Sequence, residues 1–139
     1  MALDYYVELE HTPGEIVVDD LACALMETFG LSRFPSTGIM RAAHVGVSVF
    51  ESRDRIACPD PAVTVAFRLD KFAPEDAAAD EMLAMLRWLL AHLSVALRFT
   101  DDDALTLLWR DHGVTVVARD QEFWTPRRLA ALSVSDPGA

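Results

Sequence analysis

Cysteine and lysine are scarce in this sequence. Its 139 residues contain two cysteines, Cys23 and Cys58, and a single lysine, Lys71. Cys23 falls in a helical pattern and Cys58 in a loop pattern, so their positions do not indicate a disulfide. We therefore expect two reduced thiols, as in a cytosolic protein.

Basic residues are also few. Twelve lysines and arginines stand against 22 aspartates and glutamates, which gives a formal net charge of −10. A nucleic-acid surface needs clustered cations to neutralise phosphates, so nucleic acid is not an expected partner. The acidity favours solubility and association with a basic partner, although soluble bacterial proteins are commonly acidic without such a partner.

The sequence has no long uninterrupted apolar run. Its most apolar segment, residues 82–97, contains Arg87 and His92 and is too short to span a bilayer. The amino-terminal residues lack the basic and then apolar stretches of a signal peptide. We expect a cytoplasmic protein with no membrane partner.

Recognisable motifs for catalysis or cofactor binding are lacking as well. The four histidines are isolated, and no cysteine pair has the spacing of a metal site. There is no glycine-rich phosphate loop and no nucleophile elbow. We therefore predict no catalytic residue, no metal, no cofactor and no enzymatic activity.

Strand alternation is the strongest pattern that the sequence does contain, and residues 62–72 show it best. A spacing of two places apolar side chains on one face of a strand. In this strand they are Val63, Val65, Phe67 and Leu69. The other face carries Thr64, Ala66, Arg68 and Asp70.

Other segments alternate in the same way, at residues 3–9, 41–52, 95–100, 105–109 and 114–118. In the second of these we expect Ala43, Val45, Val47 and Val49 to point inward and His44 to point outward. In the last two, Leu105, Leu107, Trp109, Val114 and Val116 form the apolar face. Residues 31–38 and 53–61 are predicted to be connections, and Asp111-His112-Gly113 is typical of a tight hairpin turn.

Two longer segments have helical periodicity. Residues 12–15 form a capping box before an apolar stripe, and Gly30 is placed to end that helix. The second helix covers residues 74–93 and buries a wide stripe that includes Met82, Leu83 and Leu86. A shorter helical piece is expected at residues 127–132.

The resulting order is β-α-β-β-α-β-β-β. It predicts a single α+β domain over residues 1–132 and a frayed tail at residues 133–139. Two helices can cover only one side of the sheet. We therefore predict a two-layer sandwich in which a mostly antiparallel sheet of about six strands carries both helices on one face.

Candidate contact residues lie in two places. Asp101, Asp102 and Asp103 form the densest charge in the chain and could contact a basic surface, or could simply be a solvated turn. Arg68 and Asp70 share one strand face and could contact a partner or form a surface ion pair.

The hexapeptide Phe67-Arg-Leu-Asp-Lys-Phe72 resembles the Sit-type immunity proteins, which are named after toxin–immunity systems of swarming myxobacteria. The amino-terminal Met-Ala-Leu-Asp-Tyr-Tyr-Val-Glu-Leu is similar to the first strand of that family. Residues 63–83 are similar to its central strand-to-helix junction, and residues 103–124 to its closing hairpin. The resemblance implies a cytosolic antitoxin that binds and neutralises a cognate toxin, although family members may also occur without one.

Two functions therefore remain open at the level of sequence. The first is a non-catalytic immunity protein. The alternative is a small-molecule-binding or enzymatic α+β domain that uses His44, Arg68 and Asp70 on the uncovered sheet face. Homodimerisation through the open sheet is a third alternative.

Overall fold

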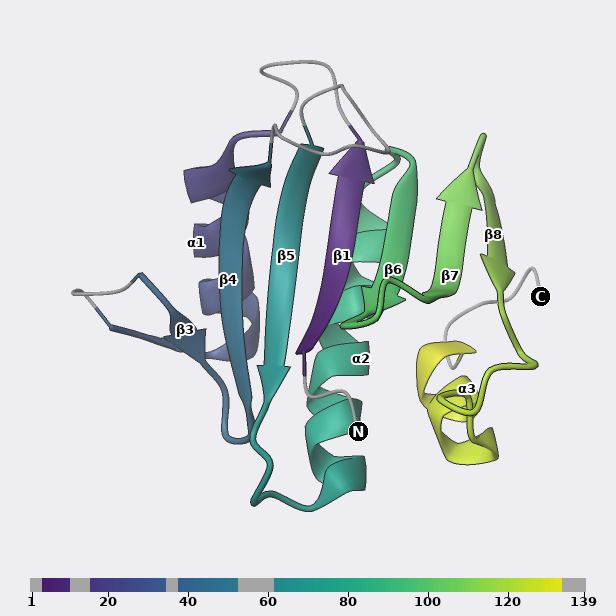
Figure 1. The fold of residues 1–139 in the computed structure, drawn as a ribbon. Helices are drawn as coiled ribbons and strands as arrows, with labels where there is room; N and C mark the ends of the chain where they lie inside the picture. The colour runs from purple at the N-terminus through teal and green to yellow at the C-terminus, as the bar shows by residue number, and fades with distance from the viewer. Residues whose placement is uncertain (1–3, 11–15, 35–37, 53–61, 134–139) are drawn as a thin grey trace.

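The computed structural model describes residues 4–10, 16–34, 38–52 and 62–133 (Figure 1). These residues form eight strands and three helices. In chain order they are β1 (Asp4–Glu10), α1 (Val18–Phe29), β2 (Ser32–Arg33), β3 (Met40–Arg41), β4 (Val45–Ser52), β5 (Ala62–Leu69), α2 (Glu75–His92), β6 (Leu97–Asp101), β7 (Thr106–Asp111), β8 (Val114–Val117) and α3 (Pro126–Ser133).

All strands belong to one antiparallel sheet, in the order β2-β3-β4-β5-β1-β6-β7-β8. The first strand of the chain is thus central, between β5 and β6. The prediction of an α+β fold with a mostly antiparallel sheet is confirmed. The expected number of about six strands is too low, because the short β2 and β3 were predicted as a loop and as part of a longer strand.

The helices lie on one side of this sheet. In Figure 1, α1 and α2 lie behind the strands, and α3 packs against α2. The expected two layers are therefore present. The third helix corresponds to the short helical piece predicted at residues 127–132.

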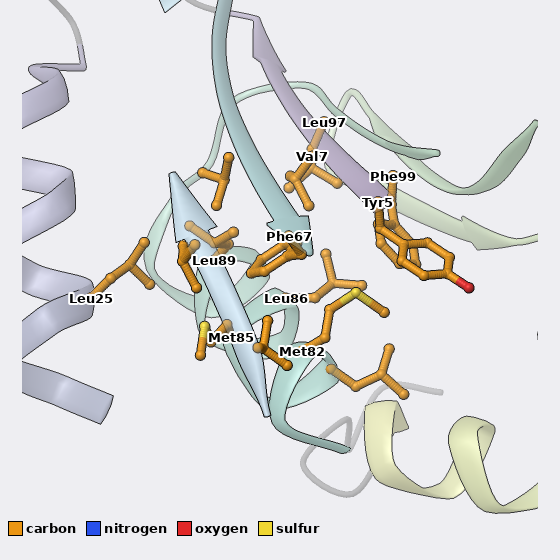
Figure 2. Close-up of a cluster of buried hydrophobic side chains, with 14 of the residues drawn as sticks. Tyr5, Val7, Leu25, Phe67, Met82, Met85, Leu86, Leu89, Leu97 and Phe99 are labelled. Atoms are coloured by element: carbon orange, nitrogen blue, oxygen red, sulfur yellow. The ribbon is translucent and has the colours of Figure 1, made fainter. Parts of the chain in front are cut away.

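The core lies between the sheet and α2, and its side chains converge as the alternation requires (Figure 2). From the strands, Val7 and Phe67 point toward the helices. From α2, a stripe spaced three and four residues apart meets them, since those positions share one helix face. The fully buried members of that stripe are Met82, Leu83, Met85, Leu86 and Leu89.

The structure of α1 agrees with the prediction at its carboxyl end and differs from it at its amino end. Its carboxyl end is confirmed: Gly30 has φ 64°, and its N–H donates to the carbonyl of Met26. A left-handed conformation at that position costs glycine little. The helix begins at Val18 rather than at residue 13, without a side-chain cap from Val17, and the predicted capping box at residues 12–15 lies outside the described residues.

The predicted strand 41–52 is two strands in the structure. Arg41 ends β3 and pairs with Gly46 of β4, so the chain turns back between them. Ala43 lies in this turn and is exposed, so its predicted inward position is wrong. Val45 and Val47 are buried as expected.

The predicted apolar face of the last hairpin is only partly confirmed, since Leu107 is buried as expected. The β6–β7 register shifts between Phe99 and Thr100, and beyond this irregularity the other set of β7 residues faces the helices. Leu108 and Arg110 are buried, whereas Trp109 is 39% exposed. The predicted inward residues Leu105, Val114 and Val116 are exposed as well. The turn itself is confirmed, since His112 and Gly113 both have positive φ.

A buried arginine that the sequence did not reveal ties β7 to the end of α2. The Arg110 guanidinium donates to the carbonyls of Leu90 (2.6 Å), Val95 (2.9 and 3.2 Å) and Leu93. These carbonyls lie at and just beyond the carboxyl end of α2, where they have no helical partners and where a cation is favoured. Burial lowers the pKa of Arg110.

Three further arginines join α2 and α3. Arg127 Nη2 lies 2.7 Å from Asp80 Oδ2, and Arg87 Nη1 donates to the carbonyl of Ala131 at 3.2 Å. Arg128 is buried, reaches Glu75 at 3.4 Å, and lies over the ring of Phe123. The helix layer is thus held partly by arginines whose charges are already partnered.

Two features considered in the sequence, membrane-spanning segments and the cysteines, can be compared with the structure. No helix in the described ranges is both long and apolar enough to cross a membrane. Cys23 is exposed on α1 as a free thiol, and Cys58 lies outside the described residues.

Candidate functional site

The sheet face opposite the helices is the candidate site, because no described helix packs on it (Figure 1). Residues from neighbouring strands line up across it in rows set by the register. One row joins Arg41, Gly46, Arg68 and Asp4, from β3 to β1. A parallel row joins Phe50, Thr64, Glu8, Arg98, Trp109 and Val116, from β4 to β8.

A hollow of about 670 Å³ lies on this face where β3, β4, β5 and β1 meet. Its floor consists of small residues, Gly46, Ser48 and Ala66. Longer side chains from β1, β3, β5 and the adjoining connections surround them: Asp4, Tyr6, Ile39, Arg41, Arg68, Asp70, Lys71 and Phe72. The hollow exists because the centre of the open face carries little side-chain volume.

Two of the predicted contact residues, Arg68 and Asp70, line this hollow. The Arg68 side chain is 79% exposed, and its Nε lies 3.5 Å from Asp4 Oδ1. An exposed pair of this kind contributes about 0–1 kcal/mol to stability, so Arg68 remains available for contacts.

Asp70 instead shapes the turn between β5 and α2. Its Oδ1 accepts from the N–H of Phe72 at 3.0 Å, and its carbonyl accepts from the N–H of Ala73 at 3.1 Å. This arrangement presents Phe72 to solvent with 86% of its surface exposed. Lys71 Nζ lies 5.1 Å from the centre of the Phe72 ring. Asp70 therefore positions an exposed aromatic ring and a cation at the rim of the hollow.

The predicted acidic turn divides into two parts. Asp101 Oδ1 accepts from the N–H groups of Asp103 (3.0 Å) and Leu105 (2.9 Å), so its carboxylate stabilises the turn. The side chains of Asp102 and Asp103 are exposed. Asp101 is therefore best interpreted as a turn residue, whereas Asp102 and Asp103 remain candidate contact residues.

Tyr6 connects this turn with the hollow and is not among the residues predicted from the sequence. Partial burial raises the pKa of its phenol, and the charges of Asp4 and Asp102 raise that pKa further, together with a hydrogen bond to Asp102, while Arg68 opposes them. The structure thus brings Arg68 and Asp102 to the same side chain. Strand alternation alone places Tyr6 and Asp4 on the outward face with Arg68, so the sequence was sufficient to predict these two as site residues. It was not sufficient to predict Arg41, because the position of Arg41 depends on the β3–β4 hairpin.

His44 does not lie beside Arg68, and that expectation is wrong. Its backbone N–H donates to Glu81 Oε1 of α2 at 3.1 Å, and its ring Nε2 lies 3.8 Å from Glu81 Oε2. The turn before β4 therefore directs His44 toward the helix side. Among the described residues, no three His, Cys, Asp or Glu side chains are grouped so as to hold a metal ion.

Fold and site together describe a small α+β protein that has a hollow, lined by charged and aromatic side chains, on the uncovered face of an antiparallel sheet. The comparison with family models then gives its family. A model described as SitI3-like matches residues 7–128, and the chain belongs to this family. The resemblance inferred from the sequence is thereby confirmed. No curated protein and no solved structure matches the chain.

Proposed function

We propose that this protein is an immunity protein that binds and neutralises a cognate bacterial toxin, without catalysis, in the cytoplasm. The observation that carries the proposal is membership of the SitI3-like family over residues 7–128. The open sheet face supports it, because binding by occlusion needs a broad, accessible surface and no reactive constellation.

The size of the face suits this function. Six of the strands have four to eight residues, whereas β2 and β3 have two each. With strands about 4.8 Å apart and roughly 20 Å long on average, the six longer strands give a surface of roughly 29 by 20 Å. A stable protein–protein complex buries about 800 Å² on each partner, which is the same order of area. The exposed Phe50, Phe72 and Trp109 offer the aromatic anchors that such interfaces favour.

The net charge of −10 supports a basic toxin. Opposite charge accelerates association by steering, and the gain falls as ionic strength rises. Asp102 and Asp103, exposed at the edge of the face, are the groups that we expect to contribute to this effect.

The proposal is tested by expressing the protein with the product of the adjacent gene. We expect the two proteins to co-purify and the producing cells to survive toxin expression. If no toxin-like neighbour forms a complex and none is neutralised in co-expression, the proposal fails.

The hollow also favours a second candidate function, binding of a small molecule, since its volume of about 670 Å³ lies within the usual range for ligand sites. Of the three residues first considered for it, Arg68 and Asp70 remain in place and His44 does not. A thermal-shift screen against metabolites and metals separates the functions, because a specific ligand raises the melting temperature by mass action.

A further inference from the structure

The described cations divide into those that the fold uses and those that it leaves exposed. Arg87, Arg110, Arg127 and Arg128 bind carbonyls or carboxylates within the helix layer and at its junction with β7. The other described cations are Arg33, Arg41, Arg68, Lys71, Arg98 and Arg119. Three of these, Arg41, Arg68 and Lys71, line the hollow on the open face. Half of these six exposed cations thus lie together at one site of a strongly acidic protein.

The carboxylates in the hollow do not cancel this charge. Asp4 contacts Arg68, and Asp70 accepts from the Phe72 N–H, so both have partners in the structure. Three cations face these two carboxylates. The lining is therefore slightly basic within a chain of net charge −10.

The geometry of the cations suits a carboxylate lying on the sheet. Arg41 and Arg68 both pair with Gly46, one from each side. Their backbones are therefore about 10 Å apart, two strand spacings, and Gly46 places no side chain between them. Guanidinium groups bind carboxylates with paired, charge-assisted hydrogen bonds.

The rim of the hollow also carries apolar side chains that a ligand can contact. Phe72 is 86% exposed and Ile39 is 39% exposed, and they line the hollow together with the cations. A ligand that places a carboxylate over Gly46 can therefore pack an adjacent apolar side chain against Phe72.

We propose that this hollow binds an exposed segment of the toxin in which acidic side chains flank a large apolar residue. This inference rests on the proposed function and deepens it by naming the anchoring chemistry. Acidic charge elsewhere on the protein attracts a basic toxin, and the hollow fixes its orientation.

The site can be tested without the toxin. The probe is a blocked peptide, glycine–glutamate–phenylalanine–glutamate–glycine, titrated into isotope-labelled protein while backbone amide resonances are followed by NMR. We expect saturable shifts at Gly46, Arg68 and Phe72, and binding about three- to tenfold weaker for the peptide with glutamine in place of glutamate. Absence of shifts at these amides, or equal binding of the two peptides, would overturn the proposal.

Two protein variants complete the test. Arg41→Gln with Arg68→Gln should weaken peptide binding by a similar factor, whereas the charge-matched control Arg98→Gln with Arg119→Gln should bind as the wild type does. Gly46→Ala should weaken binding while leaving the fold intact, because a Cβ at Gly46 meets its nearest atoms, the Arg68 carbonyl oxygen and Ile39 Cγ2, only at 3.8 and 3.9 Å. Unchanged peptide binding by either hollow variant contradicts the site.

The same variants distinguish this inference from the proposed function. Peptide binding without any toxin complex would refute the immunity function and leave the acidic-segment site standing. A toxin complex that forms with unchanged affinity in the Arg41 and Arg68 double variant would support the immunity function and refute the role of the hollow.

Discussion

The arginines behind the sheet and those on its open face have opposite surroundings. Arg110 is 8% exposed and donates to carbonyls of three residues around the end of α2. Arg68 is largely exposed and has one loose contact with Asp4. The difference indicates that the helix layer depends on its arginines for stability, whereas the open face keeps its arginines available for binding.

The largest effect should come from the packed side. Leu86 is fully buried beneath the sheet, so Leu86→Ala should lower the free energy of unfolding by about 2–5 kcal/mol. Leu105, which is 41% exposed, is the matched control, and Leu105→Ala should cost less than about 1 kcal/mol. Equal losses for the two variants in urea denaturation would show that the buried face is assigned wrongly.

Substitutions of a buried and of an exposed arginine should differ in their effect on stability. Arg110→Met should cost about 2–4 kcal/mol, because it leaves several buried carbonyls without donors. Arg98 lies on the adjacent strand with its side chain exposed, so Arg98→Met should change stability by less than about 0.5 kcal/mol. If thermal and chemical denaturation show Arg110→Met to be as stable as the wild type, the buried guanidinium does not stabilise the fold.

A smaller effect should appear at high pH. Burial raises the pKa of the Tyr5 phenol above its ordinary value of 10.0, and the nearby charge of Arg128 opposes this shift only in part. The neutral phenol therefore stabilises the folded state below pH 10, and this contribution is lost as the pH rises through the raised pKa. Between pH 10 and the raised pKa, Tyr5→Phe should lose stability less steeply than the wild type; identical slopes in this range would contradict the assignment.

The smallest effect on stability should come from the exposed acidic turn. The double substitution Asp102→Asn and Asp103→Asn leaves the hydrogen bonds to Asp101 Oδ1 in place, so the free energy of unfolding should change by less than about 0.5 kcal/mol. Association with a basic toxin should slow at low ionic strength while dissociation changes less. An association rate equal to that of the wild type at low salt would remove this turn from the contact surface.

Sequence periodicity predicted the packed side well and the open side poorly. In β1, β5 and α2, one alternating or helical pattern runs through the whole element, and the residues predicted to point inward are buried, although Ala62 and Thr64 on the other face of β5 are buried as well. In β7 the register irregularity at Phe99 and Thr100 reverses the faces, and in β3 a turn moves Arg41 next to Gly46. These features depend on pairing between distant segments, so local patterns could not place Trp109 or assemble the hollow.

Oxidative footprinting of the protein with and without its toxin, read by mass spectrometry, tests whether the uncovered sheet is the binding surface. We expect oxidation of Phe50, Phe72 and Trp109, all exposed on the open face or at its rim, to fall several-fold in the complex. Val17 and Trp88, on the helix side, should be oxidised as before. Protection of the helix side with no change at the three open-face aromatics would contradict the central claim that the uncovered sheet is the binding surface.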